Sequence, residues 1–291
     1  MIVIYNPTAG RRRAALLWRV LDVLTANGVR IDLARTTYAG HAIDLARKAA
    51  ADGERLVVAA GGDGTIAEVA RGLQGTGAVL GIIPLGTANV LAHELGLPFG
   101  PPECAAALAF GRTRPLWPGI ARSDSGERLF VQMLGVGFDA AVVHRLPLWL
   151  KRRAGRGAYV VQSLREMARY PFPAVSVRLD GIETQAGSVV VTKGRLYAGR
   201  YLLAPAARSA ERGFQVALFG CTDPLGGLLG AALYGAALPL NLLSCAPGLR
   251  LVHAREVEIA AKLPAQADGD PAGTAPLWIA DASEPIQVVV G

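Results

Sequence analysis

The sequence predicts two domains: an α/β domain built on a parallel sheet, followed by an antiparallel β-sandwich. Segments typical of strands and of helices alternate four times before residue 115, which indicates a parallel sheet with helices on both faces. Short apolar or alternating runs separated by turn residues follow, as in a sandwich or barrel. The 291 residues are enough for two domains that each bury a core.

The elements of the first half are predicted from their apolar spacing. Leucines and valines at helical intervals follow Arg11, and Gly28 is a typical helix stop. Apolar, β-prone runs and helical segments then alternate as far as Asn89. We expect strands at 2–5, 29–34, 56–60 and 79–83, helices that end near 28, 52 and 72, and a further helix after 89.

Residues 56–68 organise this half, with the sequence L-V-V-A-A-G-G-D-G-T-I-A-E. An apolar strand meets three glycines and Asp63 before a helix begins. Such glycines let the backbone approach a ligand, and the free N–H groups at a helix start attract phosphate. A carboxylate repels a phosphate unless a metal or a reacting hydroxyl lies between them. Asp63 therefore indicates a nucleotide whose terminal phosphate reacts, and the alternative is a tight turn with an Asp cap.

Polar turns follow each predicted strand of this half. The carboxyl ends of parallel strands meet at one edge of the sheet, where such folds bind ligands, so we expect a single crevice there. Its predicted lining consists of Asn6, Thr36, residues 61–65 and residues 86–89.

The second half is predicted to contain short strands and one helix. The helix spans about 157–170, because Val160, Leu164 and Met167 recur at helical intervals. The pattern changes after Pro115, which marks the approximate domain boundary. We expect strands near 119–122, 129–134, 175–179, 187–192, 200–204, 214–219, 250–260 and 276–279, and a last one at 286–290.

Residues 224–249 carry no charge. Their length is that of a membrane span, but Pro239 and Asn241 interrupt the segment. Three alternatives stay open for it: a spanning helix, a buried helix, and a surface that touches the membrane.

Composition favours an anionic partner other than nucleic acid. The net charge is +7, but aromatic residues make up only 6% and do not alternate with basic ones as in base-stacking proteins. Isolated cysteines fit neither a zinc site nor a disulfide framework, which favours a reducing cytoplasm. They are Cys104, Cys221 and Cys245.

Five motifs occur in the order seen in a known family. They are N-P-T-A-G at 6–10, G-G-D-G-T-I-A-E at 61–68, P-L-G-T-A-N at 84–89, G-V-G-F-D-A at 135–140 and D-G-D at 268–270. In these motifs the chain resembles the diacylglycerol kinase catalytic family, which includes bacterial lipid kinases and sphingosine kinases. The resemblance covers essentially the whole chain. The G-G-D-G motif alone also resembles NAD kinases and phosphofructokinases, whereas the combination points to the lipid kinases.

The resemblance implies a division of labour between the domains. Residues 1–117 are expected to form an ATP-binding α/β domain like that of phosphofructokinase and NAD kinase. Residues 118–284 are expected to form the sandwich for the lipid substrate, with ATP in the cleft between the two. The last strand, within 285–291, is expected to return to the first domain.

The resemblance also implies which residues contact the nucleotide. Thr36 matches the family's nucleotide-contacting threonine, residues 61–67 its phosphate loop, and Thr87 the threonine of its G-T-x-N turn. With the crevice turns included, the expected ATP-binding residues are Asn6, Thr36, Gly61, Gly62, Asp63, Gly64, Thr65, Ile66, Ala67, Gly86, Thr87 and Asn89.

Three acids are the catalytic candidates. Asp270 matches the acid that the family uses as proton acceptor, and Asp268 beside it is an expected support or metal partner. Phosphoryl transfer to an alcohol needs a carboxylate near the attacking hydroxyl. We favour Asp270 as the base, with Asp268 or Asp63 as alternatives. Without the resemblance, the D-G-D-P sequence is typical of a surface turn.

The chain departs from the family pattern at three positions. Val90 follows the G-T-x-N turn where the family often has aspartate, and Asp270 stands where glutamate is commoner. Many bacterial members hold a structural Mg²⁺ with an aspartate in the turn that corresponds to residues 205–213. This chain offers Glu211 there, beside two arginines, as its candidate metal ligand.

The sequence therefore predicts an ATP- and Mg²⁺-dependent lipid kinase that phosphorylates a hydroxyl of diacylglycerol or a related long-chain lipid. Two alternatives stay open: a soluble kinase of the NAD-kinase type, and a catalytically inactive nucleotide-binding regulatory protein. Glu68 is expected either to face the cleft or to cap a helix.

We expect a cytoplasmic protein that contacts the inner face of the membrane peripherally, with a homodimer left open. The candidate contact is the basic segment at 151–153 beside Trp149, for which a solvated loop is the alternative.

Overall fold

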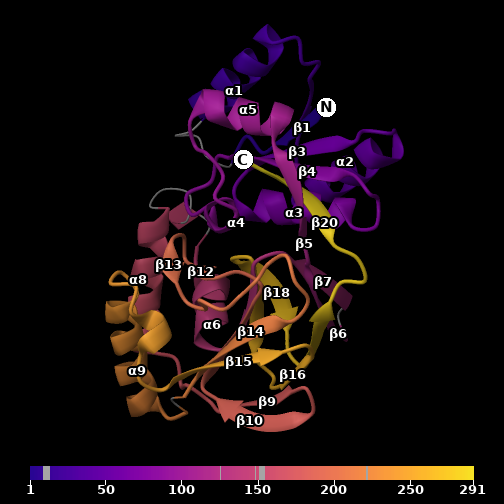
Figure 1. The fold of residues 1–291 in the computed structure, drawn as a ribbon. Helices are drawn as coiled ribbons and strands as arrows, with labels where there is room; N and C mark the ends of the chain where they lie inside the picture. The colour runs from indigo at the N-terminus through magenta and orange to yellow at the C-terminus, as the bar shows by residue number, and fades with distance from the viewer. Residues whose placement is uncertain (9–13, 125, 148, 151–154, 221) are drawn as a thin grey trace. The chain divides into compact units, whose positions relative to one another are not determined.

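The computed structural model describes residues 1–8, 14–124, 126–147, 149–150, 155–220 and 222–291. These residues form two compact units, Met1–Trp117 with Ser283–Gly291, and Pro118–Ala282. Figure 1 labels the elements of each unit. The predicted fold class is confirmed, because the first unit has a mainly parallel sheet with helices and the second has antiparallel sheets.

The first unit is built on one six-stranded sheet in the order β2-β1-β3-β4-β20-β5. Strands β1 to β4 and β20 run parallel, and β5 is antiparallel to β20. The strands are β1 (Ile2–Tyr5), β2 (Asp32–Arg35), β3 (Leu56–Gly61), β4 (Val79–Pro84), β5 (Arg112–Leu116) and β20 (Ile286–Val290). The last strand of the chain thus belongs to the first sheet.

Helices cover both faces of this sheet (Figure 1). Alternate strand residues such as Val3, Val58 and Ile83 share one apolar cluster with α1 (Ala14–Ala26) and α5 (Pro101–Phe110). Successive strand side chains point to opposite faces, so the neighbouring residues face the other layer. That layer consists of α2 (His41–Ala51) and α3 (Asp63–Leu73), which pack on each other and on β3. The short α4 (Val90–Glu94) follows β4.

The second unit contains two six-stranded antiparallel sheets. One has the order β10-β9-β16-β19-β6-β7, from β6 (Gly119–Ser123), β7 (Gly126–Phe130), β9 (Val175–Leu179), β10 (Ile182–Ala186), β16 (Val257–Ala260) and β19 (Leu277–Asp281). The other has the order β15-β14-β11-β8-β17-β18, from β8 (Met133–Val136), β11 (Ser188–Thr192), β14 (Phe214–Phe219), β15 (Leu249–Ala254), β17 (Pro264–Ala267) and β18 (Asp270–Thr274). A small hairpin joins β12 (Leu196–Tyr197) to β13 (Tyr201–Leu202).

One core cluster draws on both sheets, which therefore face each other as a sandwich. Val177 and Ile259 come from the first sheet, and Val189 and Phe214 from the second. All four are almost fully buried, and each buried side chain of this size stabilises the fold by about 1.5–3 kcal/mol. The alternating buried and exposed residues of β9 show the period of two that this packing requires.

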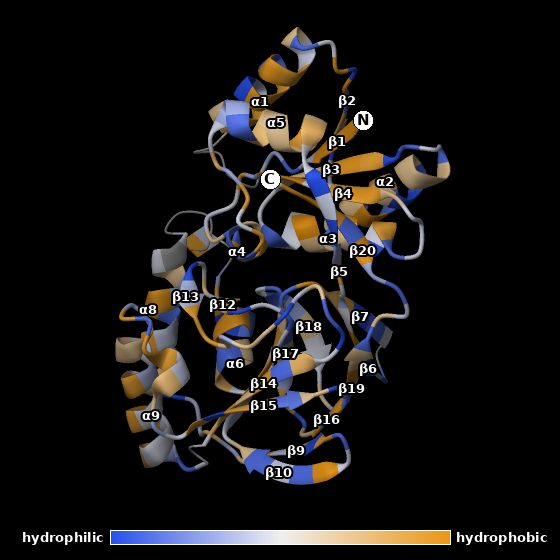
Figure 2. Ribbon diagram, in the orientation of Figure 1, coloured by the Kyte–Doolittle hydropathy of each residue, from blue (hydrophilic) through white to orange (hydrophobic). Residues whose placement is uncertain are grey.

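Three α-helices and a short 3₁₀ segment accompany the sandwich in the part of the chain that the structure describes. Figure 2 shows apolar residues along two of them, α8 and α9. The elements are α6 (Phe138–Arg145), α8 (Arg156–Met167), α9 (Pro224–Ala237) and the 3₁₀ turn η2 (Leu243–Cys245).

Two predicted strands are divided in the structure. The expected strand at 129–134 becomes β7 and β8, because the backbone N–H groups of Val131 and Gln132 bond to Asp268 instead of a neighbouring strand. The expected strand at 250–260 becomes β15 and β16, and the Asp180 carboxylate accepts the N–H groups of Arg255 and Glu256 between them.

The buried-helix alternative for residues 224–249 is wrong. In α9 only Gly227 and Gly230 are buried, and the leucines are largely exposed. Among the described helices, none is long and apolar enough to cross a bilayer. The predicted helix start at residues 11–13 and the basic segment at 151–153 lie outside the described residues.

Candidate active site

The glycine turn between β3 and α3 lies at the carboxyl edge of the parallel sheet. Gly62 occupies the N-cap position of the eleven-residue α3 and, as a glycine, has no side chain to cap it. The first N–H groups of a helix have no intrahelical acceptor, and the helix dipole makes this end positive. The turn therefore offers the backbone donors that a phosphate requires.

Two turns at this edge pack backbone against backbone. The Gly61 carbonyl accepts hydrogen bonds from the N–H groups of Leu85 and Gly86, at 2.9 and 3.1 Å. A Cβ atom on Gly86 would lie 2.5 Å from the Cα of Gly62, closer than real Cβ contacts allow. These glycines are thus required by the packing of the β3–α3 and β4–α4 turns, in addition to any ligand.

Asn6 joins the end of β1 to the glycine turn. Its Nδ2 donates to Thr65 Oγ1 at 3.4 Å, and its Oδ1 accepts from the N–H and hydroxyl of Thr8. Strand β1 lies between β2 and β3, so the chain order changes direction at this point, where open α/β sheets bind ligands. Thr36 follows β2 on the other side of β1 and is buried, with its N–H bonded to Tyr5.

Asp63 points toward the start of α4. Its Oδ1 accepts the N–H of Leu91 at 3.4 Å, and the N–H groups of Asn89 and Val90 also interact with the carboxylate. Burial raises the pKa of Asp63, and these backbone donors act in the opposite direction. The carboxylate therefore holds the β4–α4 turn against the glycine turn. The Asp-cap alternative expected Asp63 to cap the helix that follows it, whereas its partners in the structure are at the start of α4.

Asn89 is the strained residue of this edge. Its φ of 48° is left-handed, a conformation that asparagine tolerates better than most residues. Its Nδ2 donates to the Gly86 carbonyl at 2.8 Å. Its Oδ1 is buried and accepts no hydrogen bond from any group that the structure describes. Thr87, between these residues, is exposed.

Glu68 caps a neighbouring helix. Its two carboxylate oxygens accept the N–H groups of Gly40 and Ala42 at 2.9 and 3.3 Å, where α2 begins. This is the capping alternative for Glu68. The start of α2 is therefore occupied by a protein carboxylate.

Asp268 is engaged by backbone donors. Its carboxylate accepts the N–H groups of Val131, Gln132 and Met133 at 2.8, 2.8 and 3.0 Å. Its own backbone is left-handed, with φ of 50°. Asp268 thus fastens the connection between β7 and β8 and fixes the D-G-D turn, at whose end half-buried Asp270 begins β18.

A buried polar network supports the same turn. Gln266 accepts the N–H of Gly269 at 2.9 Å and donates to Asp139 Oδ2 at 2.7 Å, and the Tyr197 hydroxyl donates to Asp139 Oδ1. Burial raises the pKa of Asp139, and the hydrogen bonds from Tyr197 and Gln266 act against this. The motif at 135–140 pointed to Asp139, but sequence reasoning missed Tyr197 and Gln266, because only the folded sandwich brings them together.

The turn expected to hold a structural Mg²⁺ contains a lysine ammonium instead. Lys193 Nζ donates to the carbonyls of Glu211 and Gly213 at 2.9 and 2.8 Å and to Asp281 Oδ1 at 2.7 Å. The Glu211 side chain is exposed. Among the described residues, no group of three or more His, Cys, Asp or Glu could bind a metal. The structure therefore does not support the expected metal position at Glu211.

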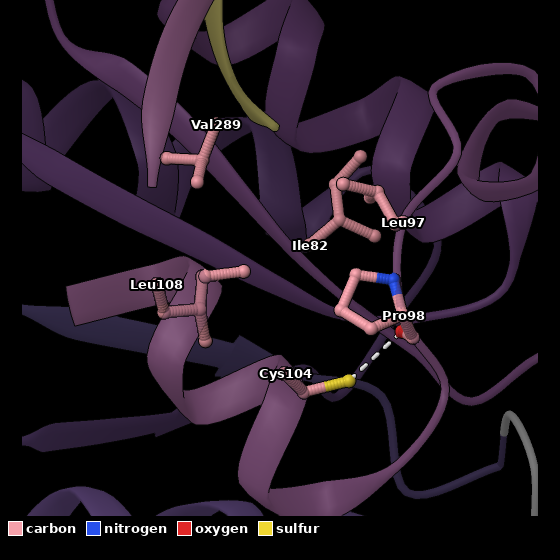
Figure 3. A pocket seen from close by; sticks show the side chains of 7 residues that line it. Ile82, Leu97, Pro98, Cys104, Leu108 and Val289 are labelled. Carbon is pink, nitrogen blue, oxygen red and sulfur yellow. Dashed lines mark hydrogen bonds between the residues drawn. The ribbon is translucent and has the colours of Figure 1, made fainter. Parts of the chain in front are cut away.

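Two hollows of the first unit have no residue of the glycine turn in their lining. One, of about 10 Å³, is lined by apolar side chains and by Cys104, whose Sγ donates to the Pro98 carbonyl (Figure 3). Burial raises the pKa of this thiol to about 11, so it stays protonated at neutral pH. A larger hollow of about 680 Å³ borders Met1 and Leu56, at the amino ends of β1 and β3. Neither lies at the ligand edge of the sheet.

Comparison with known proteins identifies the family. The model of the diacylglycerol kinase catalytic domain matches residues 1–119. The Pseudomonas putida protein named "Probable lipid kinase YegS-like" is 32% identical over 219 residues, which cover 74% of this chain and 72% of that protein. The chain belongs to the diacylglycerol kinase family of lipid kinases.

Two further proteins that resemble the chain are also diacylglycerol kinases by name. The diacylglycerol kinase of Bacillus subtilis is 33% identical over 183 residues, covering 62% of this chain and 59% of that protein. A crystal structure of a diacylglycerol kinase from Bacillus anthracis has a TM-score of 0.74, with 22% identity, and covers 100% of this chain and 96% of its own. At that identity, the match shows that the two proteins share a fold.

Predicted nucleotide residues of the chain gather at one edge of the sheet. The turns after β1, β3 and β4 are joined by hydrogen bonds and close packing, and Thr36 follows the adjacent strand. The side chains of Ile66 and Ala67 are buried in α3, and their contact with a nucleotide stays a prediction. Asp268 and Asp270 belong to the second unit.

Proposed function

We propose that the chain transfers the γ-phosphate of MgATP to a hydroxyl of diacylglycerol or a related long-chain lipid. The observation that carries the proposal is the glycine turn at the start of α3, whose N-cap is Gly62 and which is tied to Asn6 at the change of strand order. Membership of the lipid kinase family supports the class of acceptor. Mg²⁺ enters with ATP as part of the substrate.

The glycine turn supplies the phosphate contacts in this proposal. The N–H groups at the start of α3 bind the phosphate oxygens, and the α3 dipole stabilises their negative charge. The Asp63 carboxylate accepts N–H groups from residues 89–91, which offset its negative charge near the phosphates. Thr36, Thr87 and Asn89 remain the proposed contacts to the rest of the nucleotide.

Asp270 is the proposed proton acceptor. As the bond between the lipid oxygen and the γ-phosphorus forms, the bond from that phosphorus to the β–γ bridging oxygen breaks and ADP leaves. The hydroxyl proton passes to the Asp270 carboxylate. We favour Asp270 over Asp268 because three backbone N–H groups already bond to the Asp268 carboxylate, and such donors make a carboxylate a weaker base.

Incubation with radiolabelled ATP, Mg²⁺ and a total lipid extract tests the proposal, with the labelled product identified by mass spectrometry. We expect a phosphorylated lipid, and Asp270→Asn should lower its formation by more than about 100-fold while the protein stays folded. The matched control is Asp124→Asn, which removes an exposed carboxylate of the same unit. Labelling of NAD but no lipid, or ATP binding without any transfer, would overturn the proposal.

A further inference from the structure

Helices α8 and α9 expose apolar side chains and bury polar or small ones. The two helices lie side by side in the second unit. A helix on a protein surface normally turns its apolar stripe to the core and its polar face to water. Both helices have the opposite arrangement, and Figure 2 shows the apolar residues along them.

In α9 the exposed face is a continuous leucine stripe. Leu225, Leu228, Leu229 and Leu233 recur at the spacing of one helix face, and Leu225 and Leu229 are 68% and 63% exposed. The opposite face is made of small residues. Gly227 packs so closely on Phe172 that a Cβ atom would lie 2.1 Å from the ring. The glycines therefore fix which face of α9 turns inward, and the leucines remain outside.

In α8 the buried side chains are the small Ala158 and the polar Gln162 and Glu166. Gln162 Nε2 donates to Glu166 Oε1 at 2.8 Å, and Arg145 donates to Glu166 Oε2 at 2.6 Å. Val160 and Leu164, on the other side, are 60% and 62% exposed. A buried network of this kind sets the orientation of α8 just as Gly227 sets that of α9.

The apolar surface extends beyond α9 and is free of charge. Leu240 and Leu242, after the helix, are also exposed, and no charged residue occurs between Asp223 and Arg250. A monomeric protein rarely leaves a contiguous apolar surface of this kind in water. Both neighbouring helices expose their apolar side chains and bury polar or small ones. This indicates that a binding partner covers the exposed apolar surface.

We propose that this face inserts into a bilayer of anionic phospholipid. We call it the apolar helix face, and it consists of Val160, Val161, Leu164, Leu225, Leu228, Leu229 and Leu233. The stripe of α9 has no polar side chain that could set the register of a protein partner, as interfaces between proteins require. A bilayer needs no such register.

Two basic charges beside the apolar helix face match anionic headgroups, and Asp223, the N-cap of α9, is an exposed acid at the end of the face. Arg165 on α8 and Arg169 just after it are exposed. The acid of α8, Glu166, is buried and paired with Arg145. Helices that lie in a membrane interface combine an apolar face with flanking basic residues in this way. The inference rests on the faces of α8 and α9 and not on the kinase chemistry.

Co-sedimentation of the full chain with vesicles tests this inference. The vesicles contain phosphatidylglycerol and phosphatidylcholine, or phosphatidylcholine alone, without acceptor lipid or ATP. We expect binding to the anionic vesicles, weakened at least tenfold in the double variant Leu225→Gln, Leu229→Gln. The matched control is Ile182→Gln, an equally exposed apolar residue on β10, which should bind like the wild type.

Two outcomes would overturn the inference. One is vesicle binding that is absent, or equal in the wild type and the double variant. The other is a dimer, seen by light scattering, that the double variant converts to a monomer while vesicle binding persists, since this assigns the face to a second copy. The unfolding temperature of the double variant should not fall, because the substituted side chains are already in water.

Discussion

Lys193 and Asp281 form an ion pair inside the β-sandwich unit, with 2.7 Å between Lys193 Nζ and Asp281 Oδ1. The other two N–H bonds of the ammonium donate to the carbonyls of Glu211 and Gly213, so all three N–H bonds of Lys193 Nζ have an acceptor. Asp281 Oδ2 also accepts the Gly213 N–H at 2.6 Å. Burial lowers the pKa of Lys193, and the hydrogen bond and charge of Asp281 oppose this shift. The turn at 211–213 is therefore held by an internal cation.

Lys193→Met should destabilise the protein by about 3–5 kcal/mol, because the largely buried Asp281 carboxylate and two carbonyls lose the ammonium that donates to them. Urea unfolding at pH 7 measures the loss. The control Lys262→Met removes an exposed lysine and should change the free energy of unfolding by less than about 0.5 kcal/mol.

We expect the same ion pair to hold the turn without a divalent metal. Addition of EDTA should leave the unfolding midpoint of the wild type unchanged. A midpoint that falls with EDTA, or a Lys193→Met variant as stable as the wild type, would contradict this account of the turn.

The order of the elements could be predicted, whereas the inward face of a helix could not. Apolar strands and glycine turns are local signals, so the β3–α3 turn and its place at the sheet edge follow from residues 56–68. The leucines of α9 left a buried helix, a spanning helix and a membrane-touching surface open, because the contact of Gly227 with Phe172 decides which face turns inward. Lys193 follows a strand in the sequence T-K-G, and no local signal shows that its ammonium ends inside the sandwich.

The partners of the predicted acids depend on contacts between distant residues. The glycines around Asp63 indicated a phosphate site. The hydrogen bond from the Leu91 N–H to the Asp63 carboxylate depends on where the start of α4 lies in the fold. Glu68 bonds to Gly40 and Ala42, residues of a different helix start. Spacing along one segment cannot reveal such pairs.

Asp268→Asn should destabilise the protein by roughly 1.5–3 kcal/mol, because the charge-assisted bonds to Val131, Gln132 and Met133 lose their anion. Asp124→Asn, which removes an exposed carboxylate of the same unit, should change the free energy of unfolding by less than about 0.5 kcal/mol. Denaturant unfolding of the two variants compares them directly. Equal stability of the two variants would show that the bonds to Asp268 do not fix the turn.

Gly86→Ala should destabilise the first unit by about 1–3 kcal/mol, because the new methyl group would overlap the backbone of Gly62. The affinity for ATP should fall as well, since the β3–α3 and β4–α4 turns would separate. Calorimetric titration with MgATP and thermal unfolding measure the two effects. The control Gly235→Ala places its methyl group in open space on α9 and should be neutral or slightly stabilising. A Gly86→Ala variant with normal stability would mean that the turns are not in contact.

Asp63→Asn tests the electrostatics of the glycine turn through pH. Burial raises the pKa of Asp63 in the folded protein above its ordinary value of 3.8. Between 3.8 and the raised value the folded state binds more protons than the unfolded state, so the free energy of unfolding falls as pH rises through this interval. Asparagine has no proton to lose, and its Oδ1 still accepts the Leu91 N–H.

The stability of the wild type relative to Asp63→Asn should therefore decrease as pH rises from 4 upward, and the variant should be at least as stable at pH 7. Urea unfolding at several pH values gives this difference. Asp32→Asn, which removes an exposed carboxylate from the same sheet, controls for the loss of a negative charge. The opposite slope, with the wild type gaining stability over Asp63→Asn as pH rises, would show that the N–H groups of residues 89–91 outweigh burial and hold Asp63 as a stable anion.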